Sequence, residues 1–387
     1  MIGDASVYQD DPRGFDLWLL AAVVLLICIG TVMVTSSSIA TAEKYKAFAL
    51  YFFWRHVEYL ILGGVAAAIV YRVPLHVWEQ LGPGLLSATV LLLVLVLVVG
   101  LPMNGSTRWI CIGDLCFQIS ELAKISLIVY MAGFAVRQQE RLRESAAALV
   151  APTLVLGLLG ILLILEPDFG ALVVMVLTTV VMLYLSSVNV KTLLMLMTGA
   201  SLILVMFIWV TGYNLDRVTS FVQPCAPAHA LNSGYQLCQS LIAFGHGGVF
   251  GVGLGASVQK LFYLPEAHTD FIFAVLAEEL GFVGVLVLIA LYGLFVLRAC
   301  AIARQAEKLY MPFAAYLAYG IAFWVAIQAL ISMGVNTGLM PTKGLTLPFV
   351  SYGGSSMLIM MIAVALLFRI NIDTQPVRTG RAWRSPS

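Results

Sequence analysis

Long apolar runs, separated by short polar stretches, dominate the pattern of hydrophobic and polar positions along this chain. Several runs approach or exceed the roughly 20 apolar residues that an α-helix needs to cross a bilayer. We therefore predict an all-α polytopic membrane protein with about ten transmembrane helices. The predicted spans are 15–38, 54–71, 84–101, 119–136, 147–165, 170–186, 193–212, 270–297, 311–337 and 351–369. Because two of them are short and a single turn separates the fifth from the sixth, counts of eight or nine stay open.

Composition supports this class. Hydrophobic residues make up 61% of the chain and charged residues only 11%, against about 25% charged residues in soluble domains. Residues 1–14 carry Asp4, Asp10 and Asp11 against Arg13, without the basic region or cleavage site of a signal peptide. We expect the first apolar run to remain as a span, and we treat 1–387 as a single integral-membrane domain.

The distribution of Lys and Arg predicts the orientation. With the N-terminus inside, 13 of the 21 basic residues lie on the cytoplasmic side and 8 lie outside. The cytoplasmic ones lie in short loops and a tail, where the positive-inside rule is strongest. Both ends, 1–14 and 370–387, are therefore predicted to be cytoplasmic. The one long loop, 213–269 between the seventh and eighth spans, then faces outward.

Glu266, His268 and Asp270 stand just before the eighth span. Charge is costly near lipid, so an acid at this boundary usually has a function or a partner. Asp270 is placed to act on a substrate with one polar and one lipid end; the alternative is a helix N-cap. Glu278 and Glu279 lie further along the same span, and we expect them to be structural and to point in different directions.

The long loop contains a glycine-rich run, Gly245-His-Gly-Gly-Val-Phe-Gly-Val-Gly-Leu-Gly255. A dinucleotide fingerprint needs a preceding strand inside a βαβ unit, and neither is predicted here. Close backbone packing or movement of this loop is therefore favoured over nucleotide binding.

Four cysteines fall in segments predicted to face outward, where an oxidising exterior permits disulfides. Residues 108–118 read as a hairpin around Gly113-Asp114, a plausible two-residue turn. In that register Cys111 lies opposite Cys116, as a non-hydrogen-bonded pair whose spacing suits a disulfide. Cys225 and Cys238 are the second candidate pair. Buried free thiols are the alternative in each case.

Two further patterns carry chemistry. Glu121 and Lys124 lie three residues apart on one face of span 119–136; they are either a local ion pair behind an N-cap at Ser120 or a phosphate contact in a polar cavity. Lys343 lies in the Pro- and Gly-interrupted stretch 336–356. Broken backbone at membrane depth requires cover by protein or water, so Lys343 is either an anion contact or a snorkelling lysine.

One stretch, Pro341-Thr-Lys-Gly-Leu-Thr-Leu-Pro-Phe-Val-Ser-Tyr-Gly-Gly-Ser-Ser356, resembles the hallmark motif of the SEDS (shape, elongation, division and sporulation) family. Further blocks resemble the family in the same order, over roughly 15–370: Arg108-Trp-Ile110, Gln118-Ile-Ser-Glu-Leu-Ala-Lys124, Ser233-Gly-Tyr-Gln236 and Tyr263-Leu-Pro-Glu-Ala-His-Thr-Asp-Phe-Ile-Phe273. Lys343-Gly-Leu-Thr346 and Ala267 are more similar to the cell-division members than to the cell-elongation members. Three features depart from the family: Ile119 replaces a usual proline, Glu166 opens a motif more often begun with glutamine, and the outward cysteines are atypical.

The resemblance implies a ten-span peptidoglycan glycosyltransferase of the bacterial cytoplasmic membrane, acting at the division septum. Its substrate would be lipid II, the undecaprenyl-pyrophosphoryl disaccharide-pentapeptide, and its essential acid Asp270. One carboxylate can serve as general base for the attacking sugar hydroxyl, because pyrophosphate leaves readily when positive charge stabilises it. The candidate substrate contacts are Arg108, Glu121, Lys124, Arg217, Lys260, His268 and Lys343. No metal site or cofactor is indicated by the sequence, and a role for a divalent cation is left open.

The resemblance also implies a partner, a class B penicillin-binding protein that cross-links the new strands, with other division proteins and no nucleic acid. Two other functions stay open, a lipid II flippase or transporter and a non-catalytic scaffold. A transporter typically places polar groups near the membrane midplane, in two related halves. Here the polar residues cluster at the outer face and no internal repeat is seen, which favours the polymerase.

Overall fold

The computed structural model describes residues 15–46, 48–103, 106–113, 115–144, 146–195, 197–199, 221–226, 229, 232, 234–342 and 344–375. Within those ranges, eight helices are long and apolar enough to cross a membrane. They are α1 (Leu17–Lys46), α2 (Tyr51–Arg72), α3 (Leu75–Val99), α4 (Ile119–Arg137), α6 (Val150–Leu165, preceded by the 3-10 turn Ala146–Leu149), α11 (Ile272–Lys308), α12 (Pro312–Asn336) and α13 (Gly354–Asp373). The shorter helices are α5 (Gln139–Glu144), α7 (Phe169–Leu185), α10 (Tyr235–Gly247) and an apolar segment, Val190–Gly199.

Over the described residues these helices cover the predicted spans, with three clear differences at the edges. α1 continues to Lys46, beyond the predicted end at 38. α3 begins at Leu75 and carries Pro83 inside it, whereas the predicted span starts after this proline because proline usually ends a helix. α11 continues to Lys308, beyond the predicted end at 297, because a buried apolar stripe persists after the first arginine, with Ala299 and Ile302 buried. Residues 200–212 of the seventh predicted span lie outside the described residues.

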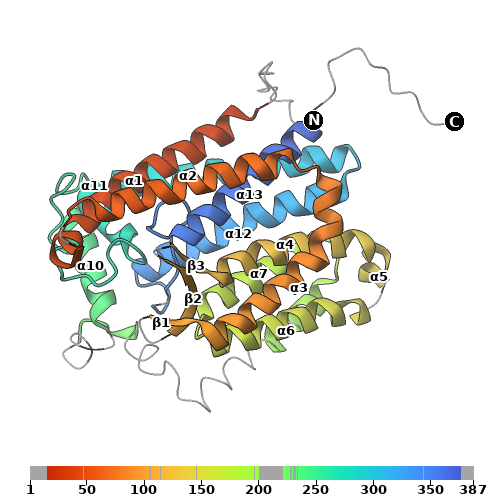
Figure 1. Ribbon diagram of the computed structural model, residues 1–387, viewed down its shortest axis with the longest axis horizontal. Helices are drawn as coiled ribbons and strands as arrows, with labels where there is room; N and C mark the ends of the chain where they lie inside the picture. The colour runs from red at the N-terminus through yellow and green to blue at the C-terminus, as the bar shows by residue number, and fades with distance from the viewer. Residues whose placement is uncertain are drawn as a thin grey trace.

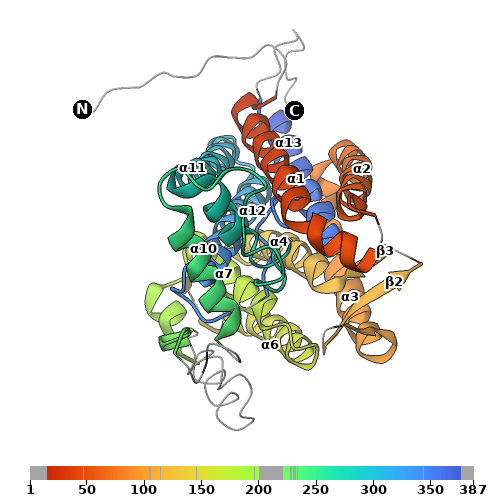
Figure 2. The same ribbon diagram turned by 90° about the vertical axis from the view of Figure 1, so that its left-hand side faces the viewer.

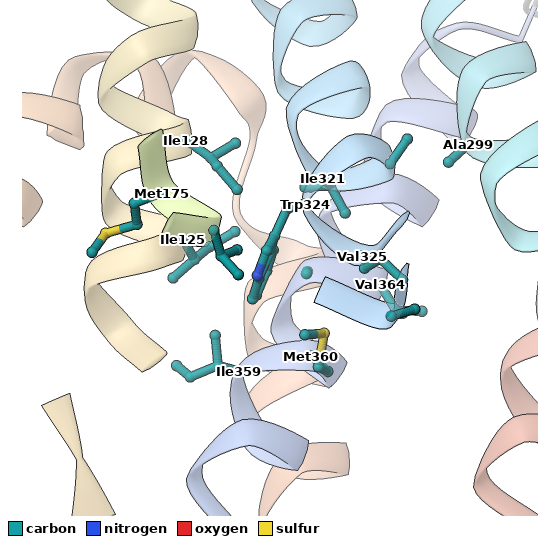
Figure 3. Packing of buried hydrophobic residues seen from close by; sticks show 14 of the residues in the cluster. Ile125, Ile128, Met175, Ala299, Ile321, Trp324, Val325, Ile359, Met360 and Val364 are labelled. Atoms are coloured by element: carbon teal, nitrogen blue, oxygen red, sulfur yellow. The ribbon is translucent and has the colours of Figure 1, made fainter. Parts of the chain in front are cut away.

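Three helices form the interior of the bundle. The most apolar stretch of α4 is 83% buried and those of α12 and α13 are 72% buried, whereas that of α2 is only 22% buried. The end-on view in Figure 2 shows α4 and α12 surrounded by the other helices. At their contact the fully buried Trp324 of α12 lies among Ile125 and Ile128 of α4 and Met360 of α13 (Figure 3). Polar side chains on α4 therefore face other helices rather than lipid.

A small antiparallel sheet lies beside the helical bundle. Its strands are β1 (Leu101–Met103), β2 (Ser106–Ile112) and β3 (Leu115–Gln118), in the order β1-β2-β3. The β2–β3 register pairs Cys111 with Cys116, as the hairpin prediction has it, and a disulfide joins the two cysteines across a Cα–Cα distance of 4.0 Å. Strand β1 was not predicted. In Figure 1 the sheet and α10 lie toward the same end of the bundle, away from α5.

The predicted long loop contains the regular helix α10, which packs along α11. A disulfide joins Cys225 to Cys238 in the first turns of this helix. The Ser240 hydroxyl donates a hydrogen bond of 2.7 Å to the carbonyl of Asn336, at the end of α12. α10 is thus fixed to both helices that approach Asp270.

Candidate functional site

The helix that follows Asp270 is interrupted. α11 is broken at Gly281, whose φ of 65° is the left-handed conformation that glycine adopts readily. A Cβ at Gly281 would lie 2.3 Å from the amide nitrogen of Gly251 in the glycine-rich loop. That loop bonds both parts of the helix: the carbonyl of Gly248 accepts from Phe282 N–H at 3.0 Å, and Val252 N–H donates to the carbonyl of Glu278 at 3.0 Å. The short first part of α11 is therefore packed separately from the long second part.

Asp270 precedes α11 rather than capping it. The N-cap position is Phe271, and its side chain makes no capping hydrogen bond. The N-cap interpretation of Asp270 is therefore wrong for this structure.

Three consecutive backbone carbonyls around Asp270 are held by the chain after α12 and by the end of α12 itself. The backbone carbonyl of His268 accepts from Tyr352 N–H at 2.9 Å, and that of Thr269 accepts from the Ser351 hydroxyl at 2.6 Å. The backbone carbonyl of Asp270 accepts from the side-chain amide of Asn336 at 2.9 Å. Asn336 also accepts from the N–H of Ala274 at 3.2 Å. Because such bonds restrict the backbone on both sides of Asp270, its side chain is presented from a fixed base.

Close backbone packing continues on the carboxylate side of Asp270. A Cβ at Gly344 would lie 3.0 Å from Asp270 Oδ2. A Cβ at Gly170 would lie 3.3 Å from the carbonyl oxygen of Gly344. Gly170, in the first turn of α7, thus packs closely against Gly344, and Gly344 packs closely against the Asp270 carboxylate. Lys343 precedes Gly344 in the sequence and lies outside the described residues.

His268 packs between aromatic rings. Its ring centroid lies 4.7 Å from that of Phe52 on α2 and 5.7 Å from that of Tyr352. Burial lowers the pKa of His268, and the charge of Glu266 opposes this shift in part. A neutral imidazole at this position can donate or accept a hydrogen bond without adding charge beside Asp270.

Glu121 and Lys124 form a buried pair inside the bundle. Lys124 Nζ lies 2.9 Å from Glu121 Oε1 and 2.8 Å from Gln328 Oε1, and the lysine side chain is 1% exposed. Gln328 in turn donates to the carbonyl of Thr346 at 3.0 Å. The expected N-cap at Ser120 is wrong, because Gln118 is the N-cap and Ser120 bonds to Asp168 at 2.7 Å. The predicted ion pair is therefore present. A small cavity beside Lys124 is lined mostly by apolar side chains, with Thr178 and Thr179 as its other polar members, and the phosphate contact stays a prediction.

Lys260, one of the predicted substrate contacts, forms a buried ion pair in the structure. Its Nζ lies 2.6 Å from Glu279 Oε1 and 2.8 Å from the hydroxyl of Ser36 on α1. Glu279 lies seven residues after the first residue of α11, about 10 Å along the helix. Lys260 therefore holds the segment that follows the glycine-rich run 245–255 onto α1 and α11.

Glu278 binds this loop from the opposite side. Its carboxylate accepts from Val258 N–H at 3.1 Å and from the Ser257 hydroxyl, and lies 2.9 Å from His246 Nδ1. The two adjacent glutamates thus point to different partners, as predicted.

Arg108 lies at the turn between α6 and α7. Its Nε donates to the carbonyl of Glu166 at 2.9 Å, and its Nη2 donates to the carbonyl of Pro167. In the same turn the carboxylate of Asp168 accepts from Ser120 and from the side-chain amide of Gln118 at 3.0 Å. Arg108 thus orders the turn that stacks on Gly344. Arg217 lies outside the described residues.

Comparison with known proteins decides the family. A family model for FtsW, RodA and SpoVE, described as cell cycle protein, matches residues 17–375. The chain belongs to this family. A relative from Thioalkalivibrio sulfidiphilus, named probable peptidoglycan glycosyltransferase FtsW, is 48% identical over 371 residues, which cover 95% of this chain and 92% of the relative. A relative of the same name from Coxiella burnetii is 46% identical over 365 residues, which cover 93% of this chain and 97% of the relative.

Solved structures of the FtsW, RodA and SpoVE family share the fold. A chain of a peptidoglycan synthase complex, described as coordinating polymerization and crosslinking, superposes with a TM-score of 0.76 at 28% identity, covering 93% of this chain and 98% of that chain. RodA of Thermus thermophilus superposes with a TM-score of 0.69 at 27% identity, covering 95% of this chain and 100% of that one. The polytopic helical fold predicted from the sequence is confirmed.

Several residues that shape this family site were not singled out from the sequence. Gln328 and Asn336 were detectable in principle, because uncharged polar side chains inside a predicted span usually have partners. Ser351 and Tyr352 lay in a recognised motif, but their bonds to residues 269 and 268 join segments far apart in the chain. Within the described ranges no three His, Cys, Asp or Glu side chains gather into a metal site.

Proposed function

We propose that this chain is a peptidoglycan glycosyltransferase that polymerises lipid II into glycan strands during septal cell-wall synthesis. The observation that carries the proposal is the anchored segment 268–270, which presents the Asp270 carboxylate from a backbone bonded at three consecutive carbonyls. The names of the relatives support the activity.

The proposed reaction needs one base. The 4-hydroxyl of the terminal GlcNAc of an incoming lipid II attacks the anomeric carbon of the growing strand. Asp270 takes the hydroxyl proton as the new glycosidic bond forms, and the bond to undecaprenyl pyrophosphate breaks with inversion at that carbon. The departing pyrophosphate carries the electron pair away, so a second acid of the kind found in glycosidases is not required.

Positive charge for the leaving group must come from cations that are not already neutralised. Lys124 and Lys260 each have a buried glutamate partner. Arg108 donates to backbone carbonyls, which leaves its formal charge uncompensated by those bonds. We assign the leaving-group role to Arg108 and to Lys343, which is covalently joined to the glycine that touches Asp270, with Arg217 as a third candidate.

We also propose a class B penicillin-binding protein as the partner that cross-links the product, with other division proteins at the septum. The structurally similar synthase complex supports this pairing, since it is described as joining polymerization to crosslinking. The proposed setting is the bacterial cytoplasmic membrane with both termini in the cytoplasm, which places Asp270 outside.

The test is lipid II polymerisation by the purified chain with its transpeptidase, comparing the native sequence with Asp270→Asn. We expect at least a thousandfold loss of glycan product, because the variant loses its only base; general-base catalysis alone typically contributes about 10²- to 10⁴-fold. Asp373→Asn, the same chemical change about 30 Å away at the far end of α13, is the matched control. Equal product from native and Asp270→Asn would remove Asp270 from the mechanism.

The alternatives give different results in the same preparation. A flippase would move lipid II across liposome membranes without forming glycan strands. A scaffold would do neither, while still binding the transpeptidase.

A further inference from the structure

Glu166 is a buried acid whose carboxyl group has no hydrogen-bond partner in the part of the chain that the structure describes. It closes α6, its side chain is 0% exposed, and neither Oε1 nor Oε2 finds a partner among the described residues. Among the described residues, the charged groups that act on it are Asp168, from the same turn, and Arg108, from β2. Arg108 directs its guanidinium to the carbonyls of residues 166 and 167 instead of to the Glu166 carboxyl. An ionised carboxylate left in this state would be costly, because burial without hydrogen bonds penalises charge heavily.

Asp168 is the well-bonded carboxyl group of this turn. Both of its oxygens accept hydrogen bonds, one from Ala171 N–H at 3.2 Å and the other from Ser120 and Gln118. Two neighbouring buried carboxyl groups with unequal hydrogen bonding do not share charge equally; the well-bonded one ionises and its neighbour keeps a proton. Burial, followed by the charge of Asp168, raises the pKa of Glu166 to about 8, and Arg108 lowers it only in part.

This turn is in contact with the site. Gly170, four residues after Glu166, packs against the carbonyl of Gly344, and Gly344 packs against the Asp270 carboxylate. A Cβ at Gly170 would also lie 2.8 Å from Cγ of Leu345. Because Gly170 is closely packed against Gly344 and Leu345, a shift of the turn displaces Gly344 and changes the surroundings of Asp270.

We propose that Glu166 is a positioning residue that works as a neutral carboxylic acid, and that loss of its proton to solvent disrupts the packing of turn 166–170 on Gly344. The consequence for activity rests on the proposed function. The protonation itself does not.

The first test is the pH dependence of polymerisation between pH 6.5 and 9.5 for native protein and Glu166→Gln. The ratio of native to variant rate cancels the titration of Asp270 and of the substrate. We expect near-equal rates at pH 7, and a native rate that falls about tenfold relative to the variant at pH 9, one unit above a pKa near 8. A flat ratio, or a variant already inactive at pH 7 although folded, would overturn the proposal.

The second test does not use activity. A buried acid whose folded pKa is raised above its unfolded value stabilises the fold fully below the unfolded pKa, and this stabilisation is lost as pH rises through the folded pKa. The melting temperature of the native protein minus that of Glu166→Gln should therefore fall from about pH 4.5 and level off above about pH 8. The exposed Glu140 on α5 gives the control, Glu140→Gln, which should show no such fall.

These results separate the two proposals. A falling melting-temperature difference without any glycan synthesis would contradict the proposed function and leave the neutral Glu166 standing. A constant difference would refute the neutral Glu166 whatever the activity. Where Glu166→Gln fails to fold, Glu166→Met, uncharged and of similar length, replaces it in both measurements.

Discussion

Two lysine–glutamate pairs are buried in the bundle, and they are built differently. Lys124 and Glu121 come from neighbouring turns of the inner helix α4, and Gln328 connects them to Thr346 in the segment beside Asp270. Lys260 comes from the segment after the glycine-rich run and Glu279 from α11, and Ser36 connects them to α1. Both lysines were predicted as anion contacts from the sequence. In the structure, only the Lys124 pair is joined to the segment that stacks on Asp270.

The difference shows what each pair does. A buried ion pair adds little net stability compared with an apolar pair, but removing one partner leaves a costly isolated charge. Glu121 Oε2 already lacks a partner among the described residues, so Lys124 is its main compensation. If Lys260 is removed, Glu279 still accepts the one hydrogen bond that the Ser36 hydroxyl can donate, since this hydroxyl lies 2.7 and 2.9 Å from its two carboxylate oxygens. The first pair is therefore the more sensitive one.

Lys124→Met should have the largest effect on stability. It isolates Glu121 in the interior, which costs about 5 kcal/mol at the upper end for a broken buried pair, and it frees Gln328 to move away from Thr346. Thermal unfolding in detergent and lipid II polymerisation should both show a loss. Lys308→Met, at the exposed end of α11, is the control; an unchanged melting temperature for Lys124→Met would mean that Glu121 is not charged.

Lys260→Met should cost less, about 3 kcal/mol at the lower end of the same range, since Ser36 still bonds Glu279. The polymerisation rate per folded molecule should stay within a few-fold of native. A folded variant with its melting temperature preserved and its turnover abolished would show that Lys260 serves the substrate, as the sequence prediction had it.

Cys111→Ser with Cys116→Ser should have the smallest effect. The disulfide closes a loop with a sequence separation of 5, and short loops give a stabilisation of about 2 kcal/mol in the chain-entropy description. The hairpin carries Arg108 and leads into α4, so the melting temperature should fall while Lys124 keeps its partners. Non-reduced peptide mapping of the native chain must first show the linked peptides, and free thiols there would contradict the structure.

Local features of this molecule were predictable and contacts between distant segments were not. The Gly113-Asp114 turn and strand alternation fixed the Cys111–Cys116 register, and the apolar runs located the helices, because both signals lie within a few residues. The pairing of Lys260 with Ser36 joins residues separated by 224 positions, and no local pattern encodes it. Glu166 stood out in the sequence only as a departure from a motif; its missing hydrogen bonds depend on where Arg108 and Asp168 point.

The break at Gly281 has a mechanical consequence for α11. A continuous helix transmits an axial push from one end to the other, whereas a helix interrupted by one left-handed residue bends there first. Load on the long second part of α11, 282–308, reaches Asp270 through Gly281 and, in parallel, through the hydrogen bonds that join Gly248 to Phe282 and Val252 to Glu278. The stiffness of the glycine-rich loop thus sets how much of any displacement of α11 arrives at the carboxylate.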